Sequence, residues 1–463
     1  MESKMTWNNC FSLRRFGVNL PEEDSRTEFE RDWDRIIFSS PFRRLQNKTQ
    51  VFPLPEEVFV HNRLTHSLEV SSVGRSLGKI IGKKLAELDT IVKDDKARLF
   101  YKNNLKNVIA AACLAHDLGN PAFGHSGEEA ISKYFKERDT DKPEDITFKG
   151  LFSPAEWRDL ITFEGNANAL RIITMNQKSR FPGGFRLTYS TIGSIIKYPC
   201  ESLASEGSKG SKHRKKYGYF KIDENIFLDV ARALNMIAEN IESRIVYKRH
   251  PFVYLVEAAD DICYNIIDFE DAHRLGILPF ETVKDMFLDV IKEDKDTAKE
   301  DLEFKMNILK EDQNETIAYL RSKAINVLTR ECANKFWENK DLIINGEYNS
   351  TLMDDLAKFK NILKRIEDVS IKSIYNARKV VELEIAGFRI MSGLVKDFVT
   401  SALIPKEQRD KEQKKIMELI PNQFKFDETS SPFVKVMHIL DFISGMTDLF
   451  ALKLYRKMRG IEI

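Results

Sequence analysis

Helical periodicity is the feature that most constrains the fold of this chain. Apolar residues recur at i, i+3, i+4 and i+7, the spacing of one helix face, over residues 66–86, 106–118 and 252–272. The second of these runs ends in a Gly-Asn-Pro sequence at 119–121, which is typical of a helix end. Residues 300–398 continue the helical pattern and contain no proline. The sequence therefore predicts an all-α fold.

Strand patterns are sparse, and the length allows more than one structural unit. The best strand candidate is Tyr217–Ile222, which predicts one arm of a small β-hairpin. A chain of 463 residues suits two or three domains, or one large domain with an attached lobe. We predict a helical core over residues 1–275 and a C-terminal helical lobe over residues 276–463 that packs on it.

Charge and composition exclude several classes of protein. Lys and Arg number 72 against 71 Asp and Glu, so the net charge of +1 argues against a globally basic nucleic-acid binder and leaves only a local basic patch open. No run of about 18 apolar residues predicts a membrane span, and no apolar signal-peptide core follows the first methionine. The five cysteines form no C-x-x-C pair, which disfavours a disulfide framework and fits a reducing, cytoplasmic location.

Four side chains in apolar surroundings suggest a metal site. His116 and Asp117 end the apolar run 106–118, where burying a carboxylate costs several kcal/mol unless it is paired or metal-bound. Taken alone, this pair also fits a capping aspartate beside a core histidine. His66 opens another helical run, and Asp260 belongs to an acidic pair that interrupts a third. Two imidazoles and two carboxylates suit Mg, Mn, Fe, Co, Ni or Zn and leave positions for water and phosphate.

Four sequence blocks make a family resemblance specific. They are RLTHSLEV at 63–70, AHDLGNPAFGHSGE at 115–128, FEGNA at 163–167 and EAADDICY at 257–264. The H…HD…D set resembles the HD-domain phosphohydrolase superfamily, and the blocks together resemble the bacterial dGTPase family over roughly Arg31 to Ala272. This resemblance implies an α-helical fold, one divalent metal per site, frequent hexamers, and hydrolysis of a dNTP to a deoxynucleoside and inorganic triphosphate.

The resemblance also indicates which residue of the acidic pair, Asp260 or Asp261, is the metal ligand. In the family, the ligand aspartate is followed by Tyr at +4 and Asp at +8, and only Asp260 has these neighbours, as Tyr264 and Asp268. Asp261 would point roughly 100° away around the helix, as a solvent-facing or supporting carboxylate. The implied metal ligands are therefore His66, His116, Asp117 and Asp260.

Three further residues match the catalytic machinery of the family. The resemblance places His125 against the scissile phosphate, with Glu128 supporting it and Glu164 near the attacking water. The departing 5′ oxygen is a poor leaving group unless it is protonated, and a histidine held by a carboxylate can supply that proton near neutral pH. Without the resemblance, His125 would be interpreted as a surface histidine in a loop.

The remaining matches concern the substrate. Arg63 corresponds to the α-phosphate-binding arginine, whose planar fork pairs with phosphate oxygens. Lys216 and Tyr217 are weaker phosphate candidates, since they adjoin a charged stretch that is more often a solvated loop.

Gln50, Tyr264 and Asp268 match the deoxyribose pocket. A tyrosine ring under the sugar leaves no space for a 2′-OH, while Gln and Asp bond the 3′-OH. A helix-core aromatic is the alternative for Tyr264.

Two other functions stay open from the sequence. One is a different HD hydrolase, such as a 5′-nucleotidase or a cyclic-nucleotide phosphodiesterase, but these lack the FEGNA and DLGNPxFGH contexts. The other is a nucleotide- or ssDNA-binding regulator with a vestigial metal site, against which the intact ligand set argues. The sequence does not predict which base is preferred, whether dGTP alone or several dNTPs are substrates, or which metal is native.

Overall fold

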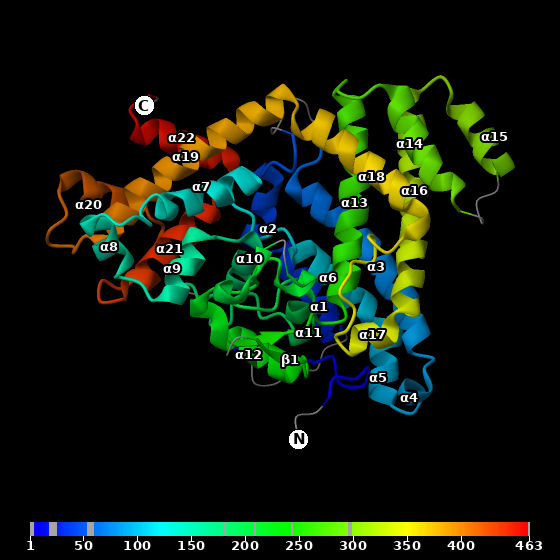
Figure 1. Cartoon of the computed structure of the whole chain (residues 1–463), viewed down its shortest axis with the longest axis horizontal. Coiled ribbons are helices and arrows are strands. Elements are labelled where there is room, and N and C mark those ends of the chain that lie inside the picture. Colours follow the sequence, from blue (N-terminus) through cyan, green and yellow to red (C-terminus); the bar gives the residue numbers. More distant parts are fainter. Residues whose placement is uncertain are drawn as a thin grey trace.

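Nearly all regular structure in the chain is helical, which confirms the all-α prediction (Figure 1). The computed structural model describes residues 4–17, 26–52, 60–178, 181–207, 210–241, 244–294 and 299–461. Up to residue 233 the helices are α1 (Glu28–Ile37), α2 (Ser40–Arg44), α3 (Arg63–Leu85), α4 (Asp89–Val92), α5 (Asp95–Leu99), α6 (Leu105–Ala115), α7 (Gly124–Lys136), α8 (Pro143–Lys149), α9 (Pro154–Ile161), α10 (Gly165–Thr174), α11 (Tyr189–Ile195) and α12 (Glu224–Ala233).

After residue 233 the described residues form one small sheet and the two longest helices, α16 and α19. The helices are α13 (Val253–Arg274), α14 (Phe280–Lys292), α15 (Lys299–Leu309), α16 (Gln313–Glu338), α17 (Lys340–Ile344), α18 (Lys360–Val369), α19 (Arg378–Leu403), α20 (Lys411–Glu418), α21 (Pro432–Ser444) and α22 (Asp448–Met458). Within the described ranges, no helix has both the length and the apolar character needed to cross a membrane.

The hairpin lies at a different place from the predicted one. Strands β1 (Ala238–Ile241) and β2 (Arg244–Tyr247) pair antiparallel. The strand prediction for Tyr217–Ile222 is wrong, because residues 217–220 have no regular structure and Lys221–Asp223 form a short 3-10 helix. Tyr217, Tyr219 and Phe220 are all buried, so this aromatic segment fills the protein interior and does not alternate between two faces of a sheet.

Local capping explains where the first histidine-bearing helix begins. The side-chain oxygen of Asn62 accepts hydrogen bonds from the backbone N–H groups of Leu64 (3.1 Å) and Thr65 (3.0 Å). These donors have no partner inside the helix, so the cap stabilises its first turn. Helix α3 therefore starts at Arg63 and carries His66 in that first turn.

Glycines let α3 and α6 approach closely. Gly74, Gly78 and Gly82 all face α6 or the turn before it. A Cβ atom added at Gly78 would lie 2.8 Å from the Cα atom of Lys106, which is closer than real Cβ atoms come to a neighbouring backbone. This crossing sets the distance between the helices that carry His66 and His116.

The buried apolar side chains form two clusters. The first cluster is built from α1, α3, α6, α13, α14 and α16, and the second from α7, α9, α19 and α21. Figure 1 shows the second group of helices on the left of the view and α13, α14 and α16 on the right. Helix α19 joins the two, since Val380 near its start belongs to the first cluster and Ile390 to the second.

The helices after residue 275 are thus shared between the clusters. Helix α16 packs on α3, α13 and α14, whereas α19 packs on α7 and α21. The division into 1–275 and 276–463 remains a prediction.

Candidate active site

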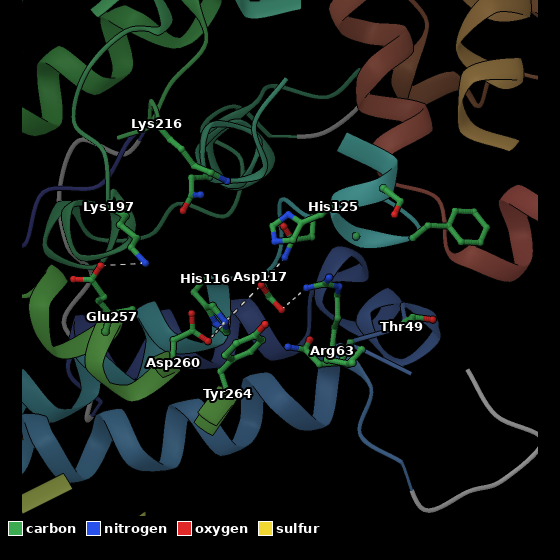
Figure 2. A pocket seen from close by; sticks show the side chains of 18 of the residues that line it. Thr49, Arg63, His116, Asp117, His125, Lys197, Lys216, Glu257, Asp260 and Tyr264 are labelled. Carbon is green, nitrogen blue, oxygen red and sulfur yellow. Dashed lines mark hydrogen bonds and ion pairs between the residues drawn. The ribbon is translucent and has the colours of Figure 1, made fainter. Parts of the chain in front are cut away.

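A cavity of about 470 Å³ lies among the ends of several helices and contains most of the predicted site residues (Figure 2). It draws on helices of both hydrophobic clusters. Its lining residues are Thr49, Gln50, Val51, Arg63, His116, Asp117, Asn120, Phe123, Gly124, His125, Ser126, Asn166, Ser194, Ile195, Lys197, Tyr198, Lys216, Val253, Val256, Glu257, Asp260, Tyr264, Tyr375, Val380, Leu383 and Glu384.

Three of the predicted metal ligands form a compact cluster. His66, His116 and Asp260 each offer one ligand atom, and these atoms lie within 4.8 Å of one another. The Oδ1 atom of Asp260 is 3.1 Å from Nε2 of His66 and 3.3 Å from Nε2 of His116. The three residues come from α3, the end of α6 and α13, so helices far apart in sequence bring them together.

The hydrogen bonding of His116 suits a metal ligand. Its Nδ1 donates to the carbonyl oxygen of Cys113 at 2.6 Å, which leaves the lone pair of a neutral ring on Nε2. That Nε2 atom is buried and faces Oδ1 of Asp260 at 3.3 Å, but it makes no hydrogen bond among the described residues. Burial lowers the pKa of His116, but Asp117 and Asp260 raise it more, to about 9. Concentrated negative charge beside an available imidazole nitrogen fits a divalent cation.

Asp117 lies beside this cluster but has other partners. Its Oδ2 accepts a hydrogen bond from Nη1 of Arg63 at 2.7 Å, and its Oδ1 accepts one from Nδ2 of Asn120 at 2.5 Å. Oδ1 is also 3.6 Å from Nε2 of His116. Asp117 is thus within reach of the metal cluster, and its role as the fourth ligand remains a prediction.

Asp261 stays outside the metal cluster. Burial raises the pKa of this carboxyl group to about 8, against the opposing effect of Lys197. The structure thus separates the two acidic neighbours, with Asp260 toward the histidines and Asp261 in the electrostatic field of Lys197.

His125 projects into the same cavity from the first turn of α7. Its side chain is 86% exposed, and its Nδ1 is 3.3 Å from Oε2 of Glu128. The other oxygen of Glu128 accepts a hydrogen bond from the backbone N–H of Gly165 at 3.1 Å, which holds the carboxylate in place. The hydrogen bond with Glu128 raises the pKa of His125. An accessible imidazole held by a fixed carboxylate can act as a general acid.

Of the two predicted phosphate candidates, Lys216 faces the cavity and Tyr217 does not. Lys216 lines the cavity, and its Nζ is 2.9 Å from Oε2 of Glu164, so the structure pairs it with another predicted residue. Burial raises the pKa of Glu164, and this residue caps the start of α10. Tyr217 is buried away from the cavity, and its hydroxyl donates to the carbonyl oxygen of Thr162 at 2.9 Å.

Arg63 lies against the turn that leads into α7. Besides its bond to Asp117, its Nε atom is buried without a hydrogen-bond partner in the described part of the chain. A Cβ atom at Gly124 would lie 2.7 Å from Nη2 of Arg63, so the end of the arginine side chain would have to shift to admit one. In Figure 2 the guanidinium group lies on the far side of Asp117 from His116 and Asp260.

Two of the three predicted sugar-binding residues line the cavity, and the third is buried. Gln50 and Tyr264 line the cavity, and the Oε1 atom of Gln50 has no hydrogen-bond partner within the described ranges. Asp268 is buried behind them and accepts a hydrogen bond from the hydroxyl of Tyr375 at 3.0 Å. Burial raises the pKa of Asp268 to about 8. The ring of Tyr375 stacks on Tyr264 with centroids 5.9 Å apart.

Sequence reasoning missed several lining residues, among them Lys197, Tyr198, Tyr375 and Glu384. Lys197 had a weak signal, because it ends an uncharged stretch at 189–196 that contains α11. Its Nζ is 3.1 Å from Oε1 of Glu257 (Figure 2). Tyr375 and Glu384 lie in or near helical segments without a distinguishing pattern.

Comparison with known proteins agrees with the geometry. Residues 63–151 match the HD domain model, which covers His66, the His116-Asp117 pair and His125. The chain is 37% identical over 465 residues to a deoxyguanosinetriphosphate triphosphohydrolase-like protein of Synechocystis, covering 99% of this chain and 100% of the relative. A like-named protein of Pseudomonas aeruginosa is 33% identical, with 98% and 99% coverage.

A Yersinia enterocolitica protein named deoxyguanosinetriphosphate triphosphohydrolase is 30% identical, with 97% of each chain covered. Identity at this level along the whole length, together with the HD domain, establishes the relationship. The chain is therefore an enzyme of the deoxyguanosinetriphosphate triphosphohydrolase family.

Proposed function

We propose that this enzyme hydrolyses a deoxynucleoside triphosphate to the deoxynucleoside and inorganic triphosphate, with one divalent metal ion per site. One observation carries the proposal: His116 and Asp260 of the metal cluster line the same cavity as His125, whose imidazole is paired with Glu128. A metal site and a positioned proton donor facing the same space are what cleavage of a phosphate ester requires.

Cationic side chains in the cavity support a polyphosphate substrate. Arg63, Lys197 and Lys216 all line it, on segments that surround the metal cluster. Arginine pairs with two phosphate oxygens at once, and lysines contribute compact positive charge. We assign Arg63 to the α-phosphate and the two lysines to the outer phosphates.

The metal would be held by His66, His116 and Asp260, with Asp117 as the proposed fourth ligand. When bound, a divalent cation would neutralise charge on phosphate oxygens and make water a better nucleophile at neutral pH. Carboxylates and imidazoles suit magnesium, manganese and other transition metals.

The protein residues then share the proton transfers. The oxygen of a water molecule bonds to the α-phosphorus while the bond from that phosphorus to the 5′ oxygen breaks. The imidazolium of His125 donates its proton to the departing 5′ oxygen, and Glu128 orients the ring without transferring a proton. We assign to Glu164, whose carboxylate is 2.9 Å from Nζ of the cavity-lining Lys216, the proton that the water loses.

Sugar selection is assigned to Gln50, Tyr264 and Asp268. The exposed ring of Tyr264 borders the cavity and would occupy the space of a 2′-OH. From the family relationship we also propose a homo-oligomer, in the form of a hexamer, in the cytoplasm.

Product analysis tests the proposal. The full-length protein is incubated with Mn²⁺ or Mg²⁺ and each of four dNTPs and four rNTPs, and the products are separated by ion-exchange chromatography and identified by phosphorus NMR. We expect dNTPs to yield free deoxynucleoside and triphosphate in one step, with metal-stripped protein inactive. Stepwise release of phosphate or pyrophosphate, leaving dNDP or dNMP, would contradict the proposal.

A further inference from the structure

The turn that presents His125 has an unfavourable backbone conformation. Phe123 has a φ of 63° and Gly124 a φ of 57°, so two consecutive residues are left-handed. Glycine adopts this region freely, but an L side chain such as that of Phe123 does so only when its surroundings hold it there. His125 follows directly, as the second residue of α7. Its position therefore depends on what stabilises Phe123.

A carboxylate from the far end of the chain holds this turn. Asp448 is buried in the first turn of α22, and its Oδ1 accepts a hydrogen bond from the backbone N–H of Phe123 at 3.0 Å across 325 residues of sequence. Its Oδ2 accepts one from the backbone N–H of Thr49 at 2.9 Å. One buried carboxylate thus joins the left-handed turn to the segment that carries Gln50.

Two neighbouring contacts have the same effect. The ammonium group of Lys48 donates to the carbonyl oxygens of Asn120 (2.5 Å) and Ser444 (2.9 Å), which joins the start of the turn to the end of α21. A Cβ atom at Gly387 of α19 would lie 2.7 Å from Cβ of Phe123, so this glycine makes room for the Phe123 side chain. The turn is therefore enclosed by C-terminal helices on both sides.

We propose that Asp448 is a positioning residue for catalysis, which fixes His125 by holding the left-handed turn at Phe123. Without this acceptor, the N–H of Phe123 would be buried without a partner, and the backbone would relax toward a right-handed conformation. Relaxation at Phe123 would rotate Gly124 and His125 away from the metal cluster. The inference rests on the proposed role of His125, and Asp448 itself does not line the cavity.

A double-mutant cycle tests this coupling. Turnover and KM for dGTP are measured with bound metal content for the full-length protein and the variants His125→Ala, Asp448→Ala and the double variant. We expect Asp448→Ala to lower kcat by about 10²-fold, the cost of a small misplacement of a catalytic group, with metal content unchanged and only a small rise in KM from the lost bond to Thr49 beside Gln50. In the His125→Ala background, Asp448→Ala should cause little further loss, because both act through one imidazole.

Two variants separate positioning from general stability. Asp448→Asn keeps one oxygen acceptor and should recover part of the lost kcat. If Asp448→Ala does not fold, Asp448→Asn replaces it in the double-mutant cycle. Asp397→Ala removes the ion pair between Asp397 and Arg459 (3.1 Å), which also joins α19 to α22 but does not touch the turn, and it should keep wild-type kcat.

The outcomes distinguish the two proposals. Additive losses from His125→Ala and Asp448→Ala, or an equal loss of kcat in Asp397→Ala, would overturn the positioning role while leaving the function intact. Full turnover in His125→Ala would overturn the proposed role of His125, and the inference with it.

Discussion

The two sides of the cavity are built in different ways. The metal side, with His66, His116 and Asp260, stands on helices α3, α6 and α13, which pack directly on one another in the first cluster. The acid side, with His125 and Glu128, stands at the start of α7, whose buried residues belong to the second cluster. Long packed helices hold the metal side, whereas the acid side starts a packed helix whose leading turn is also held by a hydrogen bond to a distant residue. Replacing residues on each side should therefore impair different steps.

The largest expected effect is on the metal side. His116→Ala should remove both bound metal and activity, with a loss of more than about 100-fold, since even residues that only support a metal ligand cost 10- to 100-fold. Asp261→Ala, one residue from Asp260 but outside the cluster, should be milder. Metal content by mass spectrometry beside turnover checks this. Loss of metal in Asp261→Ala and its retention in Asp260→Ala would show that the register of α13 is wrong.

On the acid side, chemistry should fail while binding persists. His125→Ala should keep its metal and bind dNTP, but turnover should fall by roughly 10²–10⁴-fold, the usual contribution of a positioned acid or base. Steady-state kinetics, metal content and equilibrium dNTP binding are measured on the same preparation. A His125→Ala protein that loses its metal would place His125 among the ligands and remove the contrast between the two sides.

A smaller effect should appear in the pH dependence. The Glu128 carboxylate raises the pKa of His125, so the imidazolium form that donates the proton persists to higher pH. Glu128→Gln removes that charge and lowers the pKa, so the alkaline fall of kcat should begin at lower pH. The measurement is kcat from about pH 5 to 9, with Glu129→Gln, an exposed neighbour on α7, as the matched control. If the pH at which kcat falls is the same in Glu128→Gln as in the wild type, the group that titrates there is not His125.

The smallest effects concern the sugar. Tyr264→Ala should raise ribonucleotide turnover relative to dNTP turnover by about 10-fold or more, because the space for a 2′-OH opens. Tyr375→Phe keeps the stacked ring but loses the hydrogen bond to Asp268, so KM for dNTP should rise only about 2- to 10-fold. Competing GTP and dGTP turnover measures the Tyr264 variant, and steady-state kinetics with dGTP gives KM for the Tyr375 variant. An unchanged ratio in Tyr264→Ala would make Tyr264 a structural aromatic of α13.

The same contrast explains which parts of the site were predictable. The periodic runs at 66–86, 106–118 and 252–272 correspond to α3, α6 and α13, because helix formation and capping depend on residues a few positions apart. The choice of Asp260 over Asp261 followed from the family resemblance, which implies a ligand aspartate with Tyr at +4 and Asp at +8, as Tyr264 and Asp268 stand here. Local sequence also failed in one place, since the aromatic residues after 216 resemble a strand but fill the interior.

By itself, the sequence determined the helical class, the helices that carry His66, His116 and Asp260, and part of the cavity lining, including His116, His125 and Tyr264. Only the tertiary structure decided that Tyr217 lies outside the cavity, that Lys197 and Tyr375 lie inside it, and that Asp448 holds the turn before His125. The physical reason is range: helix periodicity and caps are set by neighbours within about four residues. The bond from Phe123 to Asp448 spans 325 residues, and it forms only because α7 and the C-terminal helices pack in one cluster.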